Sequence, residues 1–554
     1  MKSHFLFLGT ISILLFLFTS CKDQEITPKN ETKDKTTVSV FPASLNIPVQ
    51  YFISWKLTVI LKVNDIQQDS FKVAWSSNNS RIAIVDGTGL VTAIGAGSTS
   101  IIGIVNGKDS VKCEVNVTNE NDYKYRVILK NKGTSGYSIN RPEEFLSSKA
   151  IARRNKWNIP VNETDLPISS EYIEQIENTG AIVIVKSKWL QTVTVNSSDI
   201  YIADRLKNLP FVKDVVKVGQ AIRNTQKTRK NIAENNLNMK VIFNKSDIDS
   251  TYYGSAWNNI NVNNGQILHD QGFKGSGIDI AVIDEGFLDI TINTSLNNIK
   301  IKGAKSFIYE DKNPYVESHG IWVTSCMATN KPGYFVGTAP DANYWLLRTE
   351  VATSEYPVEE DYWVAAIEFA DSAGVDLVNS SLSYSFHDGP NFNYKWEDMD
   401  GKTAMATQGA NMAFNKGIFI VNCAGNTSSW VGAPADSPNV LTVGAINKSG
   451  VIGDFSSFGM TVDGRIKPDI VALGVNPTAV IGIDNLSEFR FGTSYSSPII
   501  CGLVACLWQA YPKLTNKQLL DIIRKSSDRY NNPEIPYGYG IPNMQKAMQL
   551  AQQL

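Results

Sequence analysis

The sequence predicts a multidomain protein whose C-terminal half is an α/β domain with a parallel sheet and helices on both faces. From about residue 252, continuous apolar runs of strand length alternate with helical patterns, which is typical of a sheet covered on both sides. Short β-branched runs fill residues 37–118 and predict an all-β sandwich, whereas residues 123–219 mix both patterns and predict an α+β domain. A length of 554 residues allows three such domains.

The composition suits a protein with several packed cores and gives no reason to expect a nucleic-acid partner. Hydrophobic residues make up 43% of the chain, charged residues 19%, and the formal net charge is -2. No CxxC pair occurs, and the cysteine spacing fits no zinc site. We therefore expect buried free thiols, rather than a disulfide framework, at Cys113, Cys326, Cys423, Cys501 and Cys506.

Residues 1–20 have the pattern of a targeting segment. A lysine near the start precedes the apolar run "FLFLGTISILLFLF", which is too short to span a membrane comfortably, and "TSC" follows. The segment resembles a bacterial lipoprotein signal, which implies that Cys21 is lipidated and becomes the new N-terminus. An ordinary secretory signal cleaved near Ser20 is the alternative. Both alternatives predict export. The lipoprotein signal predicts a location at the cell envelope or surface, with residues 21–36 as a polar tether.

Residues 37–118 are predicted to form the first folded domain, a β-sandwich. Its β-branched runs are separated by the turn sequences "SSNNS", "GTG", "GAGS" and "NGKD". The stretch "WSSNNSRIAIVDGTGLVTAIGAGSTSIIG" (75–103) resembles the bacterial Ig-like group 2 domain. This resemblance implies a spacer or an adhesion module, and we call residues 37–118 the Ig-like domain.

Residues 123–219, here called the middle domain, follow the order β-α-β-β-α-β. This order suggests a ferredoxin-like unit. Strands are expected at 124–130, within 181–195 and at 211–219, and helices at 169–180 and 198–209. The polar, partly basic residues 220–251 are predicted to be a linker, whose Lys and Arg content indicates solvation rather than nucleic-acid binding.

Residues 252–554, the C-terminal domain, carry the α/β pattern. Strands are expected at 278–284, 343–350, 375–382, 418–426, 439–446 and 467–473. Helices are expected at 319–330, 359–374, 404–417, 494–510 and 515–527. In such sheets the functional residues follow the carboxyl ends of the strands.

Four polar residues occupy such positions. Asp284 closes an apolar strand, His319 opens a helix, Asn426 follows the turn after a strand, and Ser494 follows Gly-Thr at a helix start. A serine needs a base to take its proton, the base needs an orienting acid, and the developing oxyanion needs donors. The four residues could fill these roles together, although each one alone would more often be structural.

The motifs around these residues resemble those of subtilisin-like serine proteases. "VIDEGF", "SHGIWVTS" and "GTSYSSP" match the family's Asp, His and Ser motifs, and "GTAPDA", "VNSSLS", "APADSPNVLTVGA" and "FSSFG" match other segments. The resemblance implies that Ser494 is the nucleophile, His319 the acid/base and Asp284 its orienting residue. It further implies that Asn426 and the Ser494 amide form the oxyanion hole, and that substrate binds along Ser381, Leu382, Ser383 and Gly425.

Two departures from the family pattern leave these four groups intact. Glu285 stands where a small hydroxyl residue is usual, and it could raise the pKa of the histidine or point to solvent; "ALG" (472–474) replaces Ala-Pro-Gly. The reaction requires no cofactor and no metal ligands are predicted, although the many acidic residues leave structural calcium open. A lipase-like hydrolase is disfavoured because it would need the order Ser, acid, His.

The position of the middle domain suggests a role in regulation. Its topology, directly before a subtilisin-like domain, resembles the family's inhibitory propeptide; an unrelated spacer is the alternative. Cleavage in the linker would leave Cys21 with the N-terminal half, so the C-terminal domain would be released or held without a covalent bond. The sequence therefore predicts an exported, lipid-anchored serine endopeptidase acting on proteins or peptides. A surface adhesion protein with a disused protease fold is the alternative.

Overall fold

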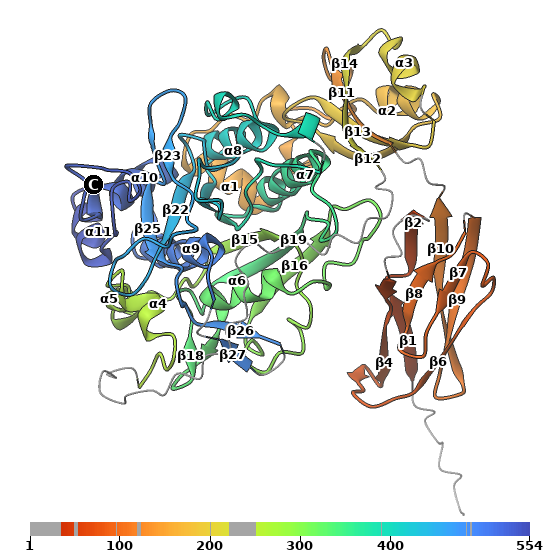
Figure 1. The fold of residues 1–554 in the computed structure, drawn as a ribbon, viewed down its shortest axis with the longest axis horizontal. Coiled ribbons are helices and arrows are strands. Elements are labelled where there is room, and N and C mark those ends of the chain that lie inside the picture. Colours follow the sequence, from red (N-terminus) through yellow and green to blue (C-terminus); the bar gives the residue numbers. More distant parts are fainter. Residues whose placement is uncertain are drawn as a thin grey trace, which may run out of the picture.

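The computed structural model describes residues 35–48, 54–95, 97–118, 123–199, 201–220, 251–388, 390–482, 485–487 and 490–554. Cys21 and nearly all of the predicted linker lie outside these residues. Within them the fold class is confirmed: a β-sandwich and an α+β domain precede an α/β domain with a parallel sheet (Figure 1). No helix in the described part of the chain is both long and apolar enough to cross a membrane.

The Ig-like domain consists of antiparallel hairpins and one parallel pair. One sheet has the order β2-β10-β9-β6, and smaller sheets have the orders β1-β4-β5 and β3-β8-β7. Alternating apolar side chains such as Ile47, Ile101 and Cys113 fill the space between them. The strands are β1 (Thr36–Phe41), β2 (Ser44–Pro48), β3 (Ser54–Lys56), β4 (Thr58–Val63), β5 (Ile66–Gln67), β6 (Val73–Ser77), β7 (Ala83–Val85), β8 (Leu90–Ala93), β9 (Gly97–Val105) and β10 (Asp109–Thr118).

The middle domain has an antiparallel sheet of order β12-β13-β11-β14. Its strands are β11 (Tyr123–Leu129), β12 (Ile182–Ser187), β13 (Thr192–Ser197) and β14 (Val212–Gln220), and α2 (Ser170–Glu177) and α3 (Ile202–Lys207) belong to the same fold. The helix α1 (Ser148–Lys156) is an addition that the sequence analysis did not predict. It lies beside the C-terminal domain rather than beside its own sheet (Figure 1).

The C-terminal domain is built on a seven-stranded parallel sheet of order β16-β19-β15-β20-β21-β22-β25. The strands are β15 (Asp279–Asp284), β16 (Lys300–Ser306), β19 (Asn343–Arg348), β20 (Leu377–Ser380), β21 (Phe419–Cys423), β22 (Leu441–Ile446) and β25 (Ile470–Leu473). The edge strand β16 was not predicted. Its alternating lysines leave it half-exposed, so it lacks the continuous apolar run that marks the central strands.

Helices cover both faces of this sheet. On one face α6 (His319–Ala328), α9 (Thr493–Ala510), α10 (Asn516–Ser526) and α11 (Met544–Ala551) share one apolar core, to which α4 (Trp257–Asn261) and α5 (Gln266–Asp270) contribute. On the other face α7 (Val358–Ala373) and α8 (Met405–Asn415) form a second core. Trp189 and Val218 of the middle domain join this second core, so the middle domain packs on α7 and α8.

The five described cysteines are buried and form no disulfide, as predicted. Burial raises the pKa of the thiols of Cys326 and Cys423 to about 12. These side chains therefore pack as small apolar groups and are not reactive thiolates at neutral pH.

Candidate active site

Asp284 and His319 meet at the carboxyl end of the sheet. Asp284 is the last residue of β15 and is fully buried, while His319 is the first residue of α6. His319 Nδ1 lies 2.6 Å from Asp284 Oδ1, and the same oxygen accepts a hydrogen bond from the amide of Glu285 at 2.8 Å. A carboxylate held in this way fixes the orientation of the imidazole.

Close backbone contact at Gly286 brings the two residues together. The amide of Gly320, on α6, donates to the carbonyl of Gly286 at 2.9 Å. A Cβ at position 286 would lie 1.9 Å from the carbonyl oxygen of Val316, which is far inside contact distance. Only glycine therefore allows the turn after β15 to pack against the segment that leads into α6.

Ser494 lies in the first turn of α9, where the helix emerges at this edge of the sheet. Ser381, just after β20, donates its hydroxyl to the carbonyl of Ser494 at 3.0 Å. The next hydroxyls along α9 face inward: Ser496 is fully buried, and Ser497 donates to Asn379 Oδ1 at 2.8 Å. Helices α9 and α6 also share apolar contacts through Tyr495 and Trp322, so Ser494 and His319 start two helices that pack together.

Asn426 follows β21 and is oriented by the start of α9. Its Oδ1 accepts hydrogen bonds from the backbone amide and from the hydroxyl of Thr493, both at 2.9 Å. Because the oxygen is engaged twice, the amide NH2 group is directed away from Thr493. An exposed amide donor beside a helix N-terminus suits an oxyanion. Thr493 is a functional residue that the sequence analysis did not identify; its place between Gly492 and Ser494 was the available signal.

The predicted substrate-binding residues lie on two neighbouring segments. Ser381, Leu382 and Ser383 continue from β20, and Gly425 follows β21, which pairs with β20 in parallel. The side-chain amide of Asn422 donates to the carbonyl of Leu382 at 2.9 Å and holds the segments side by side. Gly425 has a φ of +102°, a conformation that favours glycine.

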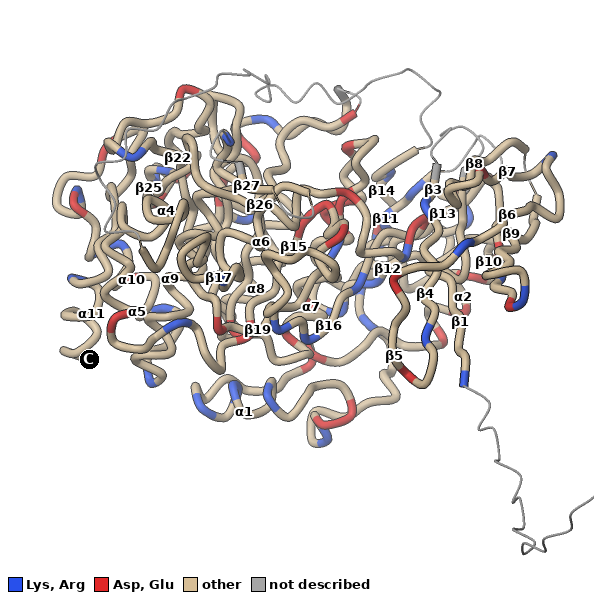
Figure 2. Tube along the Cα trace, turned by 90° about the horizontal axis from the view of Figure 1, so that it is seen from below, with Lys and Arg blue, Asp and Glu red and all other residues tan. Residues whose placement is uncertain are grey.

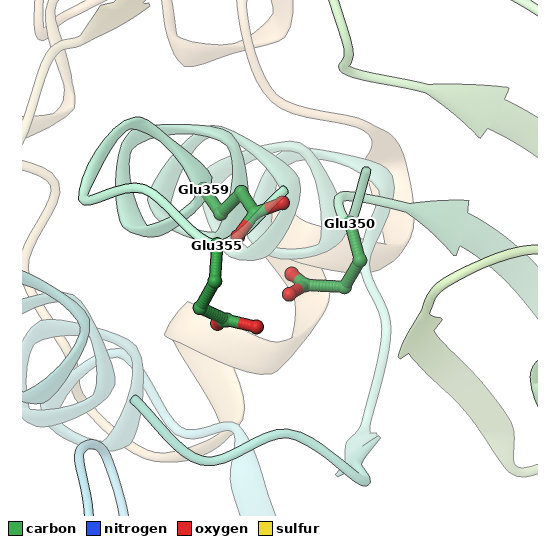
Figure 3. Close-up of side chains that lie close together, drawn as sticks. All are labelled: Glu350, Glu355 and Glu359. Atoms are coloured by element: carbon green, nitrogen blue, oxygen red, sulfur yellow. The ribbon is translucent and has the colours of Figure 1, made fainter. Parts of the chain in front are cut away.

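A group of acidic side chains lies where β19 leads into α7. Oxygens of Glu350, Glu355 and Glu359 lie within 4.8 Å of one another (Figure 3). Oxygen Oε1 of Glu350 accepts hydrogen bonds from the hydroxyls of Tyr384 (2.6 Å) and Thr349 (2.8 Å). Burial, and then the charge of Glu350, raise the pKa of Tyr384, which keeps it a hydrogen-bond donor. Two hydroxyls of the protein therefore already donate to Glu350, one member of this cluster.

The middle domain contacts the C-terminal domain through ionic groups. Arg126 forms a bidentate pair with Asp361 (2.8 and 2.6 Å), and Glu368 accepts hydrogen bonds from the amides of Lys188 and Trp189, both at 3.0 Å. Burial raises the pKa of the Glu368 carboxyl, whereas these donors favour its charged form. All these acceptors lie on α7.

The helix α1 carries a second group of buried charges. Arg154 donates to Asp371 at 2.7 Å and to Asp165 at 3.1 Å, and Lys416 donates to Asp165 at 2.7 Å. Arg153 donates to Asp371 Oδ1 and to backbone carbonyls of the C-terminal domain. Lys and Arg line α1 in Figure 2, whereas both signs are interspersed over the rest of the molecule. Through these hydrogen bonds, α1 is attached to the C-terminal ends of α7 and α8.

A cavity of about 330 Å³ lies where the three domains meet. Trp55 of the Ig-like domain, Gln220 at the end of β14 and Ser318, which precedes His319, are among its lining residues. The end of the middle domain and the residue that precedes His319 therefore line the same cavity.

Comparisons with known proteins agree with this arrangement. The family model described as the subtilase family matches residues 275–541. Models for the peptidase S8 propeptide domain, Bacteroidota, and for the bacterial Ig-like domain (group 2) match residues 124–235 and 34–115. The resemblances that the motifs and the topology suggested are thus confirmed for all three domains.

Curated relatives align mainly with the C-terminal half of this chain. Subtilisin E of Bacillus subtilis (strain 168) is 31% identical over 290 residues, which cover 51% of this chain and 68% of that protein. Subtilisin of Bacillus pumilus has the same identity over 290 residues, with 51% and 94% covered. M-protease of Shouchella clausii (strain KSM-K16) is 23% identical over 407 residues, covering 73% of this chain and 93% of that protein.

Proposed function

The chain belongs to the subtilase family and is a serine endopeptidase, and from this premise we propose that Asp284, His319 and Ser494 are its catalytic triad. The observation that carries the proposal is the 2.6 Å contact between His319 Nδ1 and Asp284 Oδ1 at the sheet edge where α9 presents Ser494. Asp284 orients the imidazole, and its charge stabilises the imidazolium that forms during the reaction.

The proposed reaction proceeds through an acyl-enzyme. His319 takes the proton of the Ser494 hydroxyl as the oxygen attacks the carbonyl carbon of the scissile peptide bond. The tetrahedral oxyanion accepts hydrogen bonds from the Asn426 NH2 group and the Ser494 amide. Collapse breaks the C–N bond, and His319 gives its proton to the leaving amine. A water molecule, deprotonated by His319, then hydrolyses the ester and restores Ser494.

A fluorophosphonate probe tests this assignment. We expect the purified protein to be labelled, and labelling and peptide hydrolysis to disappear in Ser494→Ala. Asn426→Ala should stay labelled but lose about 10²- to 10³-fold in kcat, the loss known for such a donor in this family. Labelling that persists in Ser494→Ala would overturn the choice of nucleophile, and unchanged turnover in Asn426→Ala would remove that residue from the site.

We propose that the middle domain inhibits the enzyme before processing. Its support is the contact of Glu368 with the amides of Lys188 and Trp189, together with the exit of β14 at the three-domain cavity beside Ser318. Blotting both ends of the wild type and of Ser494→Ala tests the processing step. A wild-type chain that stays full length while active on substrate would contradict it.

We propose finally that Cys21 is lipidated and that the protein is exported to the cell envelope. The support is the signal-like pattern of residues 1–20, which lie outside the described structure. Cells grown with labelled palmitate should yield labelled protein for the wild type and unlabelled protein for Cys21→Ser. Equal labelling of the wild type and of Cys21→Ser would instead favour an ordinary secretory signal.

A further inference from the structure

The segments that follow β20 and β21 both contact the start of α9 at Ser494, and we call the space between these two segments the slot. On one side the Ser381 hydroxyl is bonded to the carbonyl of Ser494 at 3.0 Å. On the other side the amide of Gly425 donates to the hydroxyl of Thr493 at 3.1 Å. Both segments are therefore fixed to the start of α9.

A third segment closes the far end of this slot. The amide of Tyr384 donates to the carbonyl of Ala433 at 2.8 Å, and the amide of Ala433 donates back at 2.9 Å. This pairing brings Gly432 against Ser383, the residues that precede each partner. Gly432 is buried.

The hydroxyl of Ser383 occupies the space between the two glycines. A Cβ at Gly432 would lie 2.6 Å from Ser383 Oγ, and a Cβ at Gly425 would lie 2.9 Å from the same atom. Real Cβ contacts are not this short, so both glycine faces are already in contact with the serine side chain. With glycine at position 383 the slot would continue to Gly432; with serine it ends at the hydroxyl.

We propose that Ser383 restricts this protease to substrates with a small side chain, such as that of alanine, glycine or serine, at the residue whose carbonyl is attacked. This inference rests on the proposed function. With the carbonyl carbon at Ser494 and its oxygen at Asn426, the side chain of that residue lies next to Gly425 and enters the slot. A phenyl ring or a leucine side chain would need the volume that the Ser383 hydroxyl occupies, and close-packed walls yield this volume only at a cost.

A series of peptide substrates tests the inference. The peptides carry alanine, leucine or phenylalanine before the scissile bond and are otherwise identical, and kcat/KM is measured with the purified, fluorophosphonate-reactive protein. The wild type should prefer alanine to phenylalanine by about 10-fold or more, the scale that misfit in a pocket produces. Ser383→Gly should raise kcat/KM for phenylalanine by about 10-fold or more and change the value for alanine by less than about 3-fold.

Two further variants separate side-chain volume from other effects. Ser385→Gly introduces the same residue two positions later, where the backbone carbonyl pairs with the amide of Tyr394 (3.0 Å), and it should keep the wild-type preference. Ser383→Thr adds a methyl group and should sharpen the preference for small side chains. Equal cleavage of the alanine and phenylalanine peptides by the wild type would overturn the inference, even if Ser383→Gly failed to fold.

The outcomes also distinguish this inference from the proposed function. A protein that hydrolyses peptides through Ser494 without regard to side-chain size would retain the proposed function and refute the role of Ser383. A protein with neither hydrolysis nor fluorophosphonate labelling would refute the proposed function itself.

Discussion

The two domains that precede the catalytic half contact it in different ways. The middle domain is attached through buried charges: Arg154 is 1% exposed, and its partner Asp371 is fully buried. The Ig-like domain meets the same half through the rings of Phe41 and Tyr315, whose centroids are 6.4 Å apart, and through residues that line the shared cavity. A buried ion pair is costly to break on one side, whereas a ring contact contributes little. The middle domain is therefore built as part of the folded enzyme, and the Ig-like domain as an independent module.

Arg154→Ala should give the largest effect on this contrast, because it leaves buried carboxylates with fewer cationic partners. In a Ser494→Ala chain cut at a protease site inserted between residues 221 and 250, the two halves should bind about 150- to 5,000-fold more weakly, equivalent to about 3–5 kcal/mol. Titration of one purified half with the other measures this. Arg141→Ala is the control, because its pair with Glu144 is exposed and should contribute no more than about 1 kcal/mol. Equal losses for both variants would remove the distinction between buried and exposed pairs.

Mild acid should weaken the C-terminal domain and spare the Ig-like domain. Burial lowers the pKa of His269 and of His387 to about 4, so between pH 6.5 and 4 the unfolded chain binds more protons than the folded one. The stability that each histidine contributes is therefore complete above pH 6.5 and falls as the pH drops, by about 3 kcal/mol for each histidine at pH 4.

Hydrogen exchange at pH 7 and pH 4.5, resolved by peptide, checks this prediction. Peptides from the C-terminal domain should lose protection at the lower pH, while peptides from the Ig-like domain, whose described residues contain no histidine, should not. A uniform loss over both domains would indicate another cause.

Glu368→Gln should have an intermediate effect on docking of the middle domain. The substitution keeps the shape but replaces a charged acceptor of two backbone amides by a neutral one, which should cost about 1.5–3 kcal/mol. The same titration of the cut halves gives the change in affinity, and Glu397→Gln, at an exposed position, is the matched control. An unchanged affinity would mean that the core contacts of Trp189 and Val218 determine docking.

Phe41→Ala should produce the smallest change. Loss of its contact with Tyr315 should alter the stability of the C-terminal domain by less than about 1 kcal/mol and leave peptide hydrolysis unchanged. Thermal unfolding and kcat/KM measure both. A loss above about 2 kcal/mol would show that the Ig-like domain is an integral part of the enzyme, contrary to the comparison.

Much of the fold could be predicted from the sequence, because the central strands are continuous apolar runs that end in polar side chains. Asp284 was singled out as the end of such a strand and His319 as the start of a helix, and their roles were assigned by the motif resemblance. The structure brings the two side chains into contact. The helix α1 was not predicted because its inward-facing residues are arginines, whose burial depends on carboxylates more than 200 positions away. Thr493 was missed for a related reason, since its role comes from contacts with Asn426, in a distant loop, rather than from a local pattern.

The location of α1 has one more consequence. Lys149 binds Asp279 and Asp376, at the starts of the strands, so this helix holds the edge of the sheet opposite to the one that carries Ser494. After a cut in the linker, the part of the middle domain near the cleft could move aside while α1 stays in place. The middle domain would then stay at a high effective concentration near the active site, because α1 still tethers it to the C-terminal domain. Such an enzyme would behave as a two-chain complex that opens and closes reversibly, with its N-terminal chain as a permanent regulatory subunit.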